Sequence, residues 1–108
     1  MTFVRACALA DLPAEGVIAV EVDDEPVAVV RSNGDVFAIS DICSHADVPL
    51  SDGDVEACEI ECWLHGSRFD LRTGKPTGPP ASSAVPVFAV QVVDADVMVD
   101  VSTPTNQS

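Results

Sequence analysis

The sequence predicts an all-β domain, and two kinds of local pattern support this. Short runs of β-branched and other apolar residues recur along the chain, and the last two, at 88–92 and 97–101, alternate with the period of two that is typical of strands. Asn33-Gly34, a strong hairpin signal, lies between two further runs. Nothing in the first forty residues follows the 3.6-residue apolar period of an amphipathic helix. We therefore expect antiparallel strands joined by tight turns.

The first forty residues are expected to form a meander. Thr2–Ala6 is the first candidate strand, and Leu9–Glu15, which contains polar residues and a proline, is expected to be a short connection. Three further apolar runs are candidate strands because the turn signals Asp23-Asp24 and Ser32–Asp35 separate them. These runs are Val17–Val22, Pro26–Arg31 and Val36–Ser40.

The middle of the chain is expected to form an insert at about residues 41–81, between base segments at about 2–40 and 82–101. A turn is predicted at Ser51–Asp54 and a strand at Val55–Glu61. Five acidic residues fall between Asp52 and Glu61, so we expect this strand to be mostly exposed. A short strand follows at Arg68–Leu71.

The last third of the chain returns to the base. Gly78-Pro79-Pro80 is expected to be a stiff loop, because proline fixes φ and lacks a backbone N–H. A final hairpin turns at Asp94–Asp96, and residues 102–108 are polar and expected to fray. At 108 residues the whole chain, 1–108, is predicted to be a single domain.

Two compact residue pairs in the insert predict a metal site. The pairs are Cys43-Ser44-His45 and Cys62-Trp63-Leu64-His65, which contain both histidines and two of the four cysteines. Each spacing lets one tight loop present two side chains to one metal centre. Thiolate and imidazole ligands suit zinc and iron–sulfur clusters. A [2Fe–2S] cluster in which two histidines replace two cysteines on one iron is the Rieske arrangement.

Two other interpretations of these pairs remain open at this point. A structural Cys2His2 zinc module is one, although zinc sites usually keep like ligands together along the chain and the pairs here are mixed. Ordinary loop residues are the other, and the clustering of both histidines argues against it.

The motif C-x-H-x16-C-x2-H, with Gly66 directly after it, resembles that of the Rieske [2Fe–2S] ferredoxins of bacterial Rieske non-haem iron oxygenase systems. The resemblance runs from about Phe3 to Val101 and includes the segments 65–75 and 78–80. It implies a small antiparallel β-barrel or sandwich base with an inserted cluster-binding subdomain. It also implies one Rieske-type [2Fe–2S] cluster, with Cys43 and Cys62 on one iron and His45 and His65 on the other.

Residues around the ligands are expected to tune or shield the cluster. Gly66 would allow close backbone approach. Ser67 stands where respiratory Rieske proteins use a serine hydroxyl to bond a bridging sulfide, but Phe69 replaces their tyrosine. We therefore expect a potential near the low end of the Rieske range of roughly −150 to +300 mV. Trp63 is a candidate docking or packing residue, and Pro79 and Pro80 are candidates to exclude water.

Charge and composition narrow the functional class. The net charge is −13 and the sequence pI is about 4.1, so nucleic acid and anionic membranes would repel the protein. No apolar run approaches the length of a membrane span, and the N-terminus lacks signal-peptide features, so a cytoplasmic location is expected. Cys7 and Cys58 are then expected to be reduced thiols that act as small hydrophobes. Arg68, Arg72 and Lys75 form a local basic group that is expected to pair with carboxylates such as Asp52 and Asp70.

The resulting prediction is a monomeric, soluble one-electron carrier with no catalytic residues of its own. The resemblance implies that a flavoprotein NAD(P)H reductase supplies electrons and that a terminal Rieske oxygenase, such as an aromatic-ring dioxygenase, receives them. A regulatory or iron–sulfur-assembly-linked Rieske protein is the alternative from another functional class.

Overall fold

The computed structural model describes residues 3–42, 49–62, 66, 68–77 and 84–102. The described part of the chain is built almost entirely from strands, with two short 3₁₀ turns, η1 (Leu9–Asp11) and η2 (Leu50–Asp52). The strands are β1 (Val4–Ala8), β2 (Gly16–Val22), β3 (Glu25–Ser32), β4 (Asp35–Ser40), β5 (Val55–Glu56), β6 (Glu59–Glu61), β7 (Arg68–Asp70), β8 (Val87–Val93) and β9 (Asp96–Asp100).

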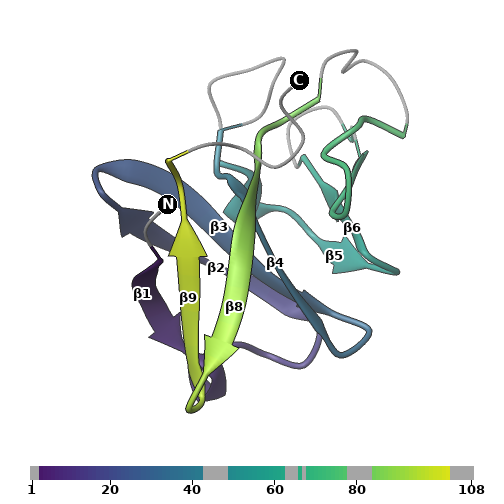
Figure 1. The fold of residues 1–108 in the computed structure, drawn as a ribbon. Helices are drawn as coiled ribbons and strands as arrows, with labels where there is room; N and C mark the ends of the chain where they lie inside the picture. The colour runs from purple at the N-terminus through teal and green to yellow at the C-terminus, as the bar shows by residue number, and fades with distance from the viewer. Residues whose placement is uncertain (1–2, 43–48, 63–65, 67, 78–83, 103–108) are drawn as a thin grey trace.

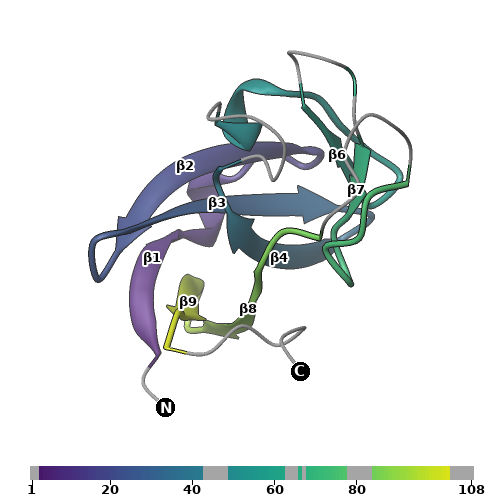
Figure 2. The same cartoon turned by 90° about the horizontal axis from the view of Figure 1, so that it is seen from above.

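These strands form two antiparallel sheets. The larger sheet has the order β1-β9-β8-β4-β3-β2, and the smaller has the order β5-β6-β7. The edge strands β1 and β2 of the larger sheet contact each other, so that sheet curls into a nearly closed barrel, seen from above in Figure 2. The small sheet lies outside the barrel, beside β3 and β4 (Figures 1 and 2). The predicted all-β class, with a barrel base, is confirmed.

Strand β3 is buried on both faces, which explains its continuous apolar sequence. Val27 and Val29 point into the barrel, where they pack with residues of β4, β8 and β9. Ala28 and Val30 point outward and pack against the small sheet. We call this second apolar group the interface core; its fully buried members are Ala28, Val30, Ile39, Leu50, Ile60, Cys62, Phe69, Leu71 and Val85, with Val87 almost as deeply buried.

The prediction of a single, mostly exposed strand at Val55–Glu61 is wrong in two respects. The segment is a hairpin, because Ala57 and Cys58 adopt positive φ angles of 53° and 63° and turn the chain between β5 and β6. It is also not mostly exposed, since Cys58 and Ile60 are buried. The acidic side chains alternate with these residues, so a run that is acidic in composition still presents an apolar face to the interface core.

The remaining strands are close to their expected positions. The first strand begins later than expected, at Val4, and the Leu9–Glu15 connection contains the turn η1. The hairpins at Asn33-Gly34 and at Asp94-Ala95 both use positive φ angles, as tight β-hairpin turns require. No helix in the described part of the chain is long and apolar enough to cross a membrane.

Candidate metal centre

The structure describes one of the four expected ligands, Cys62. This residue directly follows β6, and its side chain is fully buried in the interface core. The backbone N–H of Gly66 donates to the Cys62 carbonyl at 2.9 Å, which begins to close the second ligand loop. The other expected ligands and four of the expected tuning or shielding residues lie outside the described residues; these are Cys43, His45, His65, Trp63, Ser67, Pro79 and Pro80.

The surroundings of Cys62 fit a thiolate ligand of an iron–sulfur cluster. Its neighbours in the interface core are apolar residues of β3, β4, β6 and β7. A buried thiolate without a counter-charge would be costly, and binding to ferric iron would supply the positive charge that offsets this cost. The remaining expected donors are a second thiolate and two neutral imidazoles, which together form the mixed set that a Rieske-type [2Fe–2S] cluster requires.

Gly66 has a conformational reason to be glycine. Its φ is +76°, a left-handed value that residues with a side chain adopt only at a cost. The nearest described atom to an added Cβ would be Glu61 Oε2, at 3.9 Å. The close backbone approach to the cluster that is expected at Gly66 stays a prediction.

Phe69 packs in the interface core and is fully buried. It lies on β7 opposite Ile60 of β6, and Pro76 bridges to it from the segment after the turn. Its ring therefore fixes the small sheet against the barrel at the base of the second ligand loop. Without a hydroxyl it can influence a cluster only by packing and by excluding water.

Arg68 ties β7 to β6 beside the second ligand loop. Its Nε donates to Glu59 Oε1 at 2.8 Å, and its Nη1 lies 3.9 Å from Glu61 Oε2. The hydrogen bond to Glu59 is the main reason that the pKa of Arg68 is raised. The expectation that the basic group pairs with carboxylates is correct for Arg68, but its partners are these two glutamates rather than Asp52 or Asp70. The reason is the β6–β7 register, which places Glu61 opposite Arg68.

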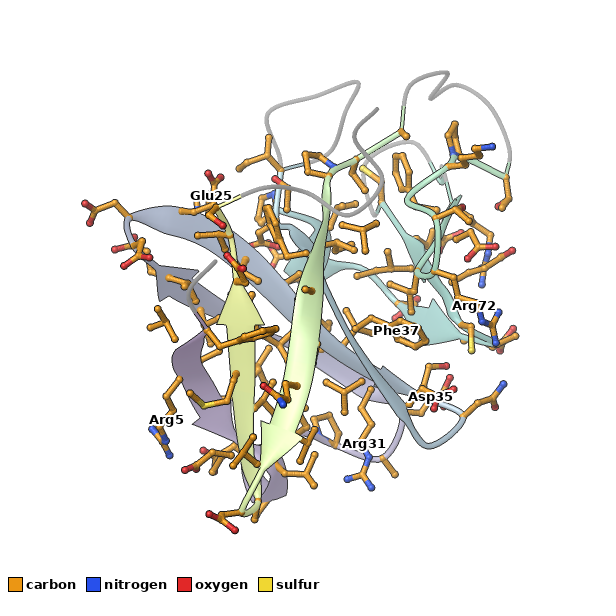
Figure 3. The ribbon with its side chains drawn as sticks, in the orientation of Figure 1. Arg5, Glu25, Arg31, Asp35, Phe37 and Arg72 are labelled. Atoms are coloured by element: carbon orange, nitrogen blue, oxygen red, sulfur yellow. The ribbon has the colours of Figure 1, made fainter. Side chains whose placement is uncertain are left out.

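Cys58 belongs to a polar contact that sequence reasoning missed. Its backbone N–H donates to Ser32 Oγ at 2.9 Å, and Asn33 Nδ2 lies 3.5 Å from its sulfur. Arg72 Nη2 lies 3.4 Å from the same sulfur, and Figure 3 shows Arg72 on the side of the molecule that carries Phe37. Ser32 in turn donates to Glu15 Oε2. The turn between β5 and β6 is thus bonded to the turn between β3 and β4.

The two remaining cysteines differ in environment. Cys58 is buried, as expected of a small hydrophobe, but its sulfur also accepts hydrogen bonds. Cys7 lies in the barrel interior, where burial is the main cause of a raised thiol pKa. Cys7, Cys58 and Cys62, the cysteines in the described part of the chain, are all free.

Comparison with known proteins identifies the family. A family model described as "Rieske [2Fe-2S] domain" matches residues 2–89. The ferredoxin component of biphenyl 2,3-dioxygenase from Rhodococcus jostii (strain RHA1) is 38% identical over 100 residues, covering 93% of this chain and 94% of that protein. The biphenyl dioxygenase ferredoxin subunit of Pseudomonas sp. (strain KKS102) is 35% identical over 103 residues, covering 94% of each.

Solved structures give the same result. The ferredoxin of carbazole 1,9a-dioxygenase from Nocardioides aromaticivorans IC177 superposes with a TM-score of 0.88 and 40% identity, covering 97% of this chain and all of that one. A second solved structure is a complex of reduced oxygenase and oxidized ferredoxin in carbazole 1,9a-dioxygenase. The matching chain also has a TM-score of 0.88, with 30% identity, and the match covers 97% of each chain.

The fold and these comparisons define an iron–sulfur electron-transfer protein. The chain belongs to the Rieske [2Fe–2S] domain family, and its relatives of matching extent are ferredoxins. It is therefore an electron-transfer protein with one Rieske-type cluster rather than a catalytic subunit. This family membership favours the iron–sulfur interpretation over the zinc alternative.

Proposed function

We propose that this ferredoxin carries single electrons from a flavin-dependent NAD(P)H reductase to a terminal Rieske oxygenase. The observation that carries the proposal is its similarity, over more than nine-tenths of the chain, to ferredoxin components of dioxygenase systems. One related ferredoxin forms a complex with its oxygenase, which supports an oxygenase as the electron acceptor here. We propose that this electron transfer takes place in the cytoplasm, where NAD(P)H is available. We also propose that the ferredoxin is a monomer when it binds each partner.

Four residues are proposed to hold the cluster: Cys43 and Cys62 on one iron, and His45 and His65 on the other. The bound cluster would supply a one-electron acceptor whose two imidazoles raise its potential above that of an all-cysteine cluster. The chain supplies the surroundings: the apolar packing around Cys62 keeps water from one thiolate. Gly66, Ser67 and Phe69 are proposed to tune the cluster, and Trp63, Pro79 and Pro80 to shield it.

The strong negative charge is proposed to speed encounter with basic partner surfaces. A net charge of −13 on 108 residues creates a long-range field, and complementary charges mainly raise association rates. The rate of reduction by the reductase should then fall as ionic strength rises. A rate that is independent of salt would show that the charge does not guide docking.

The test of this function begins with the optical and EPR spectra of the purified protein, before and after reduction with dithionite. We expect a red-brown oxidised form that bleaches and a rhombic reduced signal with an average g below the free-electron value. Cys62→Ser and His65→Ala should lose this signal, whereas Cys7→Ala and Cys58→Ala, which alter the cysteines not proposed as ligands, should keep it. If either ligand variant retained the wild-type spectrum, the proposed ligand set would be wrong.

The carrier role needs a separate assay. Catalytic amounts of the protein should restore NAD(P)H-dependent turnover when added to a flavoprotein reductase and a Rieske oxygenase that do not react together. A protein with the Rieske spectrum that is reduced but never passes its electron to an oxygenase would favour the regulatory alternative.

A further inference from the structure

One short segment of the insert contacts the residues that lead into each of the two proposed ligand loops. We call Pro49–Asp54, which includes η2, the strap. In sequence it lies between the first ligand pair, at 43–45, and the second, at 62–65. Leu50, its second residue, is fully buried in the interface core together with Cys62. The two ends of the strap are fixed by different kinds of contact.

The first end is held by Asp41, a buried carboxylate with 7% of its surface exposed. Ser51 donates to both of its oxygens: the backbone N–H reaches Oδ1 at 2.7 Å, and the hydroxyl reaches Oδ2 at 3.0 Å. The backbone N–H of Leu50 also donates to the Asp41 carbonyl at 2.6 Å. Residues 42 and 49 form a bridge between these contacts. These contacts join the two described ends, 41–42 and 49–51, of the chain segment that contains Cys43 and His45 in sequence.

Asp41 is itself fixed to the barrel. Its backbone N–H donates to the carbonyl of Pro26, in β3, at 3.1 Å. Asp41 is thus anchored to the barrel through its backbone, and its carboxylate binds the strap through two hydrogen bonds from Ser51. A bidentate contact between a charged acceptor and two donors is among the stronger hydrogen-bonded arrangements available to a partly buried group.

The second end of the strap lies directly against the residue that precedes Cys62. The backbone N–H of Glu61 donates to the carbonyl of Asp54 at 2.8 Å. Gly53 approaches Glu61 so closely that a Cβ on Gly53 would lie 1.6 Å from the Glu61 carbonyl oxygen. The strap is therefore in backbone contact with Glu61, the residue before Cys62, and bonded to Asp41, two residues before Cys43.

We propose that Asp41 is a positioning residue for the [2Fe–2S] cluster. By holding the strap, it sets the separation of the two ligand loops before the cluster binds. A cluster needs all four ligands at fixed positions, and a loop already closed loses less conformational entropy when it binds. The inference rests on the proposed ligand set, because the strap matters for the cluster only if residues 43–45 and 62–65 supply the ligands.

The test compares two substitutions of the same residue. Asp41→Asn keeps the shape and can keep both contacts, since its carbonyl can accept from the Ser51 N–H while its amide donates to the Ser51 hydroxyl. Asp41→Ala removes both contacts. The readouts are the half-life of the cluster's visible absorption in excess iron chelator, the reduction potential and EPR g values, and the apparent Tm. We expect Asp41→Ala to lose its cluster at least about tenfold faster than the wild type, equivalent to about 1.4 kcal/mol, whereas Asp41→Asn stays within about twofold.

Asp100 offers a matched control on the barrel. It is a buried carboxylate in β9, and Ser102 donates to it through its backbone N–H at 2.9 Å and through its hydroxyl at 2.5 Å. Asp100→Ala should lower the apparent Tm but leave cluster half-life, potential and g values unchanged at temperatures where the protein is folded. Ser51→Ala, which removes only the hydroxyl donor, should give an intermediate loss rate and keeps the test open if Asp41→Ala does not fold.

Three results would overturn the inference. Asp41→Ala could keep the wild-type loss rate and EPR signal; Asp100→Ala could accelerate cluster loss as much as Asp41→Ala; or Asp41→Asn could behave like Asp41→Ala, which would assign the effect to charge. Failure of the ligand set is distinguishable, because Cys62→Ser would then retain the Rieske spectrum in an otherwise wild-type chain.

Discussion

Replacing Gly53 by alanine tests the contact between the strap and the second ligand loop. Gly53 has φ −92° and ψ −178°, an extended conformation that any residue adopts, so alanine meets no backbone strain there. The obstacle is space: the new Cβ would lie 1.6 Å from the Glu61 carbonyl oxygen and 2.8 Å from its carbonyl carbon. Both atoms are backbone, so rotating a side chain cannot relieve the clash.

The magnitude follows from what must move. An ordinary carbon–oxygen contact is about 3.3 Å or longer, so the strap and β6 must separate by more than about 1 Å. Overpacking of this kind costs about 1–3 kcal/mol and occasionally more. Alanine recovers about 0.4–1 kcal/mol by restricting the unfolded chain. Because the clash is with backbone atoms, we take the upper end of the overpacking range, about 3 kcal/mol, which leaves a net loss of about 2–2.6 kcal/mol. This loss lowers Tm by about 10–20 °C for a domain of this size.

The assay is thermal unfolding of the cluster-loaded protein by far-ultraviolet circular dichroism at one fixed scan rate. Gly34→Ala is the opposite kind of control, because Gly34 has φ +82° but nothing within 4 Å of an added Cβ. Its cost is conformational only, about 1–2 kcal/mol, with no effect on the strap. Gly53→Ala should also accelerate cluster loss, whereas Gly34→Ala should not. A Gly53→Ala protein with an unchanged Tm and cluster half-life would refute the close contact.

Three further substitutions test other parts of the structure. Hydrogen bonds from Ser32 and from the Asn33 backbone lower the pKa of Glu15, so the stability it contributes is present above its ordinary pKa of 4.5 and is lost as pH falls through the folded value. At about pH 6–8, roughly 1.5 units or more above that ordinary pKa, urea unfolding should therefore show Glu15→Gln less stable than the wild type by a constant amount. This difference should shrink in acid, and a pH-independent difference would contradict the reasoning. Phe69→Ala removes a fully buried ring and should cost about 3–5 kcal/mol, measured in the same urea experiment; a loss below about 1 kcal/mol would show that the ring is not tightly packed. Ser67→Ala should lower the potential in a redox titration if the hydroxyl bonds a bridging sulfide, and an unchanged potential would rule out that bond.

Much of the fold could be predicted because its signals are local. The runs at 17–22, 26–31 and 36–40 are strands in the structure, with ends that differ by one residue at most. Asn33-Gly34 forms the expected hairpin because its residues tolerate the positive φ angles of that turn. The segment 55–61 could not be assigned by composition, since its acids suggest exposure while its burial depends on the partner sheet.

The sequence by itself determined the strand pattern of the barrel and the two cysteine–histidine pairs, because both depend on residues that are near one another along the chain. Only the tertiary structure decided which distant residues contact those elements. Asp41 accepts a hydrogen bond from Ser51, Gly53 packs against the Glu61 backbone, and Cys58 donates to Ser32. No local sequence pattern encodes these contacts, because the partners are far apart along the chain. Docking the small sheet against β3 buries the outward face of that strand, and the apolar contact it creates places Leu50, Ile60 and Cys62 together. Burial between distant segments, rather than local propensity, is the physical reason that Cys62 lies in this apolar core.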